Sequence, residues 1–151
     1  MDAATYPNPK VIEFIEANVI PVQLKHDAQP MARDYNVKWT PNLLIVDGDG
    51  KEHHRIIGFL PPVELICSLL LGIGKAHFNR NELEAAIAAF DRVLAEYPYA
   101  SAAPEAVFFR GVALYKSTHV SQHLKDAYQK LQTHYHGSEW AWRAYPYWLL
   151  P

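Results

Sequence analysis

A pattern of small and aromatic residues recurs in the second half of this 151-residue chain at an interval of 37 to 38 positions. Gly74 and Gly111 lie 37 residues apart, and the units that they open close with Val93–Pro98 and Leu131–His136. Each unit contains two stretches in which apolar residues have helical spacing. A period of this length built from two helices predicts a helical-repeat array, in which each unit buries one face against its neighbour.

The first half has a different sequence pattern, since residues 1–62 contain seven of the eleven prolines and only short apolar runs. We place a boundary at Pro61-Pro62, because two prolines end a strand and the second can open a helix. The elements expected before the repeats are a helix from Asn8-Pro9, a strand at 19–24, a helix at 28–35, a buried strand at 42–46, a turn at 47–50, a return strand at 52–57 and a helix at 63–71. This predicts a domain over 1–62, with helix 63–71 as a junction, and helical repeats over 72–151 that end in a capping helix at 138–148.

The composition excludes several classes of protein. The formal charge of −2 argues against a nucleic-acid partner, which usually selects for a basic surplus. No apolar run reaches the roughly 18 residues of a membrane span, and the first residues show no secretory signal. Cys67 is the only cysteine, so neither an internal disulfide nor a cysteine-rich zinc site is expected. These features predict a soluble cytoplasmic protein without a membrane or nucleic-acid partner.

The repeat half resembles tetratricopeptide repeats. The first unit carries small, aromatic and proline residues at the positions of that family, namely Gly74, Ala76, Phe78, Ala86, Phe90 and Pro98. The second unit departs from the pattern, with a longer expected inter-helix loop at 117–122 and His136 in place of the last proline. Two units are fewer than the roughly three that an independent array needs for stability, so we expect the array to pack against the first half of the chain.

The first half resembles the C-terminal two-thirds of a thioredoxin domain. The residues that carry this resemblance are Tyr35–Val46, Asp47–Lys51 and Ile56–Phe59. The resemblance implies a cis peptide bond at Thr40-Pro41, on the side of the fold where that family places its redox cysteines. The expected fold class is therefore a truncated thioredoxin-like α/β domain followed by all-α, tetratricopeptide-like hairpins.

The same resemblance places Met1 a few residues after the second redox cysteine of the family. It implies that the central strand and the CxxC motif are absent from this chain. Either the gene encodes a remnant or the native protein begins upstream of Met1. Because the absent strand would lie between 19–24 and 42–46, we expect these two segments to expose edges through which the chain self-associates.

Trp39, Thr40 and Pro41 form the candidate peptide-binding site that the resemblance implies. In the family, the loop before the cis-proline holds an extended peptide by strand addition. The alternative is that Pro41 only shapes the turn into the following strand.

No catalytic residue, metal site or cofactor is expected. Cys67 lies mid-helix among apolar residues and is interpreted as a buried small hydrophobe. His53 and His54 should point to opposite faces of a strand, and the histidines in general are interpreted as surface residues. Gly72–Lys75 only partly matches a phosphate loop, and Asp47–Gly50 matches a hairpin turn better than a calcium loop.

Two functions remain open on this basis. The first is a non-catalytic interaction module whose repeats and cis-proline loop bind a protein or peptide partner. The second is a thiol-disulfide oxidoreductase, with a role in cell redox homeostasis, whose CxxC lies upstream of Met1.

Overall fold

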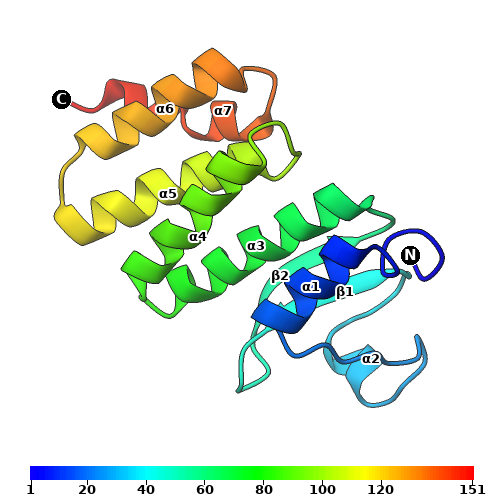
Figure 1. The fold of residues 1–151 in the computed structure, drawn as a ribbon. Helices are drawn as coiled ribbons and strands as arrows, with labels where there is room; N and C mark the ends of the chain where they lie inside the picture. Colours follow the sequence, from blue (N-terminus) through cyan, green and yellow to red (C-terminus); the bar gives the residue numbers. More distant parts are fainter.

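A single long helix, α3 (Pro62–Asn79), joins a small α/β layer to a stack of helices (Figure 1). The computed structural model describes all residues, 1–151. The α/β layer contains α1 (Pro9–Asn18), α2 (Met31–Asp34), β1 (Asn42–Val46) and β2 (Glu52–Ile57). The stack continues with α4 (Leu83–Glu96), α5 (Ala103–Thr118), α6 (Gln122–His134), α7 (Glu139–Arg143) and a 3₁₀ helix at Tyr145–Leu149.

Helix α1 begins where the sequence predicts. The Asn8 side chain accepts a hydrogen bond from the amide of Lys10 at 3.0 Å, and Pro9 occupies the first turn, where no amide is needed. Val11 and Phe14 are buried on the inner face of α1, against α3 and the sheet.

The sheet is an antiparallel hairpin of β1 and β2, closed by the turn at 47–50, in which Gly50 adopts a φ of 78°. The strand β1 is half-buried rather than buried as expected. Ile56 faces α1 and α3, so Arg55, its neighbour in the strand, faces the other side. There its guanidinium donates a hydrogen bond to the Tyr35 carbonyl at 2.6 Å, which ties the end of α2 to that face.

Residues 19–24 do not form the predicted strand. The segment belongs to no helix or strand, no strand lies beside it to pair with, and the sheet has only two strands. Ile20, Val22 and Leu24 are 92%, 77% and 55% exposed. The apolar alternation alone does not make a strand, because pairing also needs a neighbouring segment.

The helix predicted at 28–35 is a single turn, α2, that begins at Met31. The Gln29–Pro30 bond is cis, and Pro30 occupies the position just before the helix. Residues 28–30 therefore lie outside the helix.

Helix α3 extends well beyond the predicted range 63–71 and runs through residues 71 and 72 without a break. Buried residues surround its axis, because α1 and the sheet pack on one side and α4 and α5 on the other. Gly72 lies against Ile45 and His54 of the sheet, whereas Gly74 lies against Phe90 of α4. A helix that is apolar all round is typical of a core position between two layers.

The helices after β2 form two consecutive hairpins, α3–α4 and α5–α6 (Figure 1). Each hairpin has one close helix crossing: a Cβ on Gly74 would lie 2.6 Å from the Phe90 ring, and one on Gly111 would lie 2.5 Å from the Ala127 Cβ. The two crossings join residues with the same separation in sequence. The loop at 119–121 is no longer than the loop at 80–82, contrary to the expectation from 117–122, and each contains a residue with positive φ, Asn81 and His119.

The expected closing helix is α7 followed by the 3₁₀ helix, and Ser138 caps α7 by accepting a hydrogen bond from the Ala141 amide. Trp140 packs against Phe108 and Phe109 of α5, as a capping residue does. Trp142 and Trp148 remain 74% and 64% exposed.

Candidate functional site

The loop that leads into β1 contains the predicted site residues Trp39, Thr40 and Pro41. The loop is held at both ends, since the Val37 amide donates to the Ala32 carbonyl at 2.8 Å and the Pro41 carbonyl accepts from the Gly58 amide at 2.9 Å. The Thr40–Pro41 peptide bond is cis. Between these anchors, the backbone groups of residues 38–40 make no hydrogen bond within the chain.

The side chains of this loop border a hollow of about 240 Å³. It is lined by His26, Val37, Lys38, Trp39 and Thr40. Trp39 is 70% exposed, although tryptophan is a residue that folding usually covers. The loop therefore presents an apolar surface beside unpaired backbone donors and acceptors.

The unpaired backbone continues along β1. Because the Pro41 carbonyl bonds to β2, the alternation of an antiparallel pair turns the amides of Leu43 and Ile45 toward β2. The same alternation turns the amides and carbonyls of Asn42 and Leu44 toward the open edge of β1. The Asn42 side-chain oxygen is also buried without a hydrogen-bond partner. An open acceptor edge thus extends from Lys38 to Leu44.

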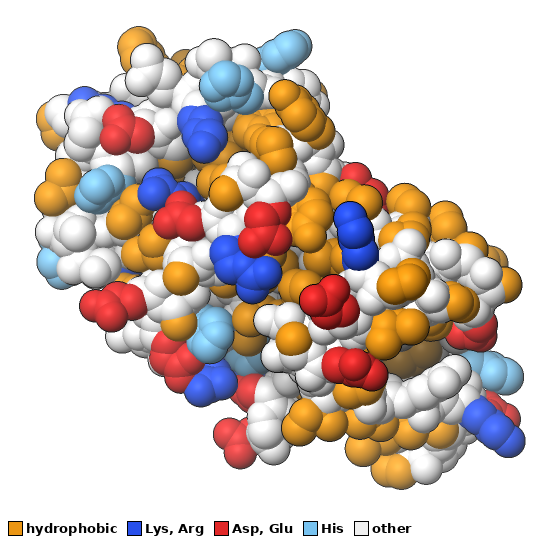
Figure 2. Space-filling view, viewed as in Figure 1, with side chains coloured by type: hydrophobic (Ala, Val, Ile, Leu, Met, Phe, Trp, Pro, Cys, Tyr) orange, Lys and Arg blue, Asp and Glu red, His pale blue; other side chains and the backbone are white.

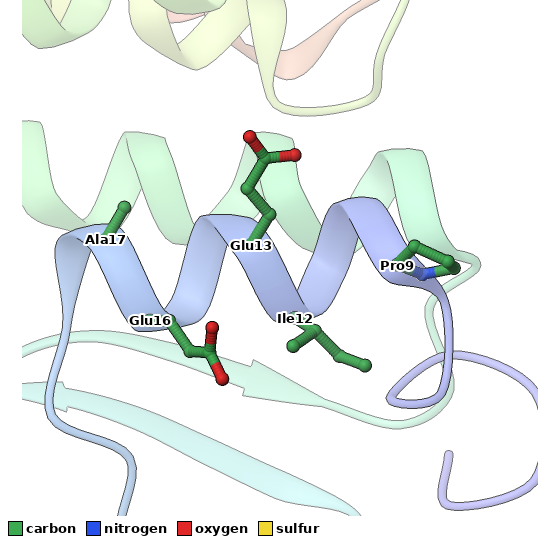
Figure 3. A pocket seen from close by; sticks show the side chains of 5 residues that line it. All are labelled: Pro9, Ile12, Glu13, Glu16 and Ala17. Carbon is green, nitrogen blue, oxygen red and sulfur yellow. The ribbon is translucent and has the colours of Figure 1, made fainter.

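A larger hollow, of about 550 Å³, lies on the outer face of α1 (Figure 3). Only residues of α1 line it: Pro9, Ile12, Glu13, Glu16 and Ala17. The carboxylates of Glu13 and Glu16 point away from one another in Figure 3 and do not converge on a common point. Paired acid-base chemistry requires such convergence, so the hollow carries no argument for a reaction.

Residues 1–72 match the family model of a thioredoxin-like domain. The match covers the α/β layer and reaches into α3, and it supports the resemblance found in the sequence. No curated protein and no solved structure matches the chain. We call residues 1–72 the thioredoxin-like segment.

Cys67, the only thiol of the thioredoxin-like segment, is fully buried in α3. Burial raises the pKa of this thiol to about 12, with a further contribution from the nearby Glu64 carboxylate. The thiol is therefore protonated near neutral pH and is shielded from solvent. Both properties are opposite to those of an attacking cysteine, which is exposed and has a lowered pKa.

His53 and His54 are buried or half-buried, so the interpretation of the histidines as surface residues is wrong for these two. They also do not point to opposite faces. A β-bulge leaves His53 unpaired, because Val46 pairs with Glu52 and Ile45 with His54. Both rings therefore reach α3, where His53 bonds to Asn79 at 3.0 Å and His54 to Ser68 at 3.0 Å.

His54 belongs to a chain of polar groups that links the sheet to α5. Its Nδ1 lies 3.3 Å from the Lys75 ammonium, which donates to Glu105 at 2.7 Å. An ammonium only donates, so Nδ1 accepts and Nε2 carries the proton that is donated to the Ser68 hydroxyl. His54 in this tautomer cannot remove the proton of Ser68, so the pair is not an activated nucleophile.

No group of three or more metal-ligating side chains gathers anywhere in the structure. Gly72–Lys75 lies inside α3, so its backbone amides are used by the helix and do not form a phosphate loop. None of the helices combines the length and the apolar character needed to cross a bilayer.

Trp39, Thr40 and Pro41 stay the site residues that the sequence predicts, and the sequence analysis missed two features of this region. The first is the set of amides of Asn42 and Leu44 that point to the open edge of β1. Which residues of β1 bond to β2 and which face the open edge follows from the pairing register of the hairpin, which no simple sequence pattern encodes. The polar chain from Ser68 to Glu105 joins residues from three elements, and only the helical spacing of Ser68 and Lys75 pointed to a shared face.

Proposed function

We propose that the thioredoxin-like segment binds an extended polypeptide by strand addition along Lys38–Leu44, and that the chain acts as a non-catalytic protein-interaction module. The observation that carries the proposal is the run of unpaired backbone groups beside the exposed Trp39. In strand addition, such groups provide affinity through main-chain hydrogen bonds, and neighbouring apolar surface provides selectivity.

The helical hairpins have a positioning role in this proposal. Their equivalent crossings at Gly74 and Gly111 support a tetratricopeptide-like repeat, and the repeats pack directly on the thioredoxin-like segment through α3. They would hold a second part of the same partner at a fixed place relative to the Trp39 loop.

The proposal is tested by titrating the chain with a seven-residue peptide of alternating valine and threonine, with lysine at both ends. A control peptide carries N-methyl groups on alternate amides, which removes the donors that strand addition uses. We expect only the unmodified peptide to bind, as measured by calorimetry. Equal binding of the two peptides would contradict strand addition.

A pair of tryptophan variants locates the site. Trp39→Ala is expected to weaken peptide binding about tenfold, as truncation of a contacting tryptophan commonly does. Trp142→Ala is the matched control, because Trp142 is similarly exposed but lies on α7. Equal affinity of the two variants for the peptide would place the binding surface elsewhere.

Thiol-disulfide exchange is the alternative function, and it would require thiols other than Cys67. The buried Cys67, with its raised pKa, offers no attacking thiolate. The chain of residues 1–151 is accordingly expected to show no disulfide reductase activity above that of its Cys67→Ser variant. A longer chain that supplies two further cysteines would be the form in which this alternative can be tested.

A further inference from the structure

We propose that the segment Ile20–Leu24 of one copy adds as a parallel strand to the β1 edge of a second copy, and that the exchange is reciprocal, giving a two-fold symmetric dimer. This inference rests on the proposed function, since it names an occupant of the same acceptor edge.

The donor segment is free to form a new strand. Residues 20–24 belong to no helix or strand, and their backbone makes no hydrogen bond within the chain. Their apolar side chains, at positions 20, 22 and 24, have the period of a strand and are largely exposed. The donor has five residues, as many as β1.

The two edges of the donor are not equivalent. In a strand conformation, the amides of Ile20, Val22 and Leu24 would point to one edge, and none of the three is missing. The opposite edge would use the amides of residues 21 and 23, and Pro21 has none. The complete edge is therefore the one that meets the outward groups of Asn42 and Leu44.

Charge at the ends of the strands selects the parallel direction. Lys25 and His26 follow the donor, and Asp47 and Asp49 follow β1. Parallel pairing brings these basic and acidic ends together, whereas antiparallel pairing would place Lys25 near Lys38. Like charges at close range disfavour the second arrangement.

A second copy is the occupant that satisfies both unpaired surfaces at once. Each chain carries one donor and one acceptor edge, so a two-fold exchange leaves neither of them open. Exposed edges of this kind are a standard route to association between chains. Binding of an unrelated polypeptide would fill the β1 edge but would leave Ile20, Val22 and Leu24 in water.

Two proline variants test the pairing in the full chain. Val22→Pro removes a donor from the complete edge, and Gln23→Pro removes one from the edge that Pro21 already interrupts. Both positions are exposed and without hydrogen bonds, so both variants are expected to fold. By sedimentation equilibrium, Val22→Pro should raise the dissociation constant of the dimer at least about tenfold, because each dimer loses two interchain hydrogen bonds. Gln23→Pro should change it less than about twofold.

A charge exchange tests the direction of the strands. Lys25→Glu is expected to weaken the dimer, and Lys25→Glu with Asp49→Lys is expected to restore it. Hydrogen exchange supplies an internal control: amides of Asn42 and Leu44 should gain protection as the dimer forms, whereas those of Leu43 and Ile45, already bonded to β2, should not change.

A chain that stays monomeric at its highest soluble concentration would overturn the inference, as would a dimer that Val22→Pro leaves intact. Peptide titration of the Val22→Pro variant separates the two proposals. Binding by this variant supports strand addition at the edge whether or not the wild-type chain dimerises. A dimeric wild type whose Val22→Pro variant binds no peptide would leave the dimer standing and contradict the proposed function.

Discussion

His54 joins the sheet to α3 through two hydrogen bonds, and its position lowers the pKa of its ring. Its ring accepts from Lys75 and donates to Ser68, so both nitrogens are used by α3. Burial, together with the Lys75 charge, lowers the pKa of His54 from 6.5 to about 4. The ring is therefore neutral near neutral pH, as its two hydrogen bonds require.

This shift makes stability depend on pH. The unfolded chain binds a proton at His54 below pH 6.5, but the folded chain resists it until about pH 4. The free energy of unfolding is therefore expected to fall by about 3 kcal/mol as the pH decreases through this interval. Urea unfolding of His54→Gln should lack this component, since the amide can still donate to Ser68 and does not titrate. Parallel pH dependence in the two proteins would contradict the assignment.

The face of the strand on which His53 lies could not be predicted from the sequence. The alternation of a strand placed His53 and His54 on opposite faces, and one extra residue in β2 brought both to α3. Trp39 belongs to a short motif that is visible in the sequence, and its side chain is 70% exposed, but its role in binding stays a prediction. Side chains whose place depends on a bulge or on a third element cannot be read from local spacing.

At the scale of the elements, the hairpins depend on glycines that allow two helices to touch. At Gly111, α5 crosses α6 very closely. A Cβ added to Gly111 would lie 2.5 Å from the Ala127 Cβ and 3.2 Å from the His123 carbonyl oxygen. None of these atoms can rotate away. The helices can accommodate a larger residue only by moving apart.

Gly111→Ala is therefore expected to destabilise the fold by about 1–3 kcal/mol, although alanine favours helix formation by up to about 1 kcal/mol. Thermal or urea unfolding measures the loss. Gly137→Ala is the control, since nothing lies within 4 Å of the added carbon. The double variant Gly111→Ala with Ala127→Gly should regain stability; failure to do so would mean that the crossing is not the cause.

Some helices and strands were predicted correctly from the sequence, and others were not. Asn8-Pro9, the glycines of the 47–50 turn and the apolar runs beside it define α1, β1 and β2 almost to the residue. The strand at 19–24 was wrong because pairing is a property of two segments. The end of the junction helix at 71 was also wrong, because Gly72 and Gly74 suggest an interruption, whereas both are packing contacts inside α3.

At the scale of the whole molecule, one core crosses the predicted domain boundary. A single cluster of buried residues joins α1 and the sheet to α4 and the start of α5, with α3 at its centre. Figure 2 shows apolar side chains on the surface over both parts of the molecule. The division at 62 and 72 stays a prediction, and α3 contributes to the packing on either side of it.

Leu70 of α3 is 2% exposed and tests this coupling. Leu70→Ala is expected to cost about 2–5 kcal/mol. The urea midpoints reported from the α/β layer and from α7 should both fall and should still coincide, as they do when one cooperative unit unfolds. Fluorescence of single-tryptophan chains that retain Trp39 or Trp140 measures the two regions.

Val63→Ala is the matched control for that experiment, because Val63 is on the same helix but is 55% exposed. It should leave both midpoints nearly unchanged. Two separate transitions in Leu70→Ala would show that the layers unfold independently.

The continuity of α3 fixes the two layers relative to one another, because both pack along the same unbroken helix. An 18-residue helix is a stiff rod about 27 Å long. The sheet and the hairpin helices pack on opposite sides of this rod, so a ligand on the sheet and a ligand on the hairpins would be held apart by the width of the helix. A fusion that transplants the hairpins to another protein must carry residues 62–79 with them, because α3 is the first helix of the α3–α4 hairpin.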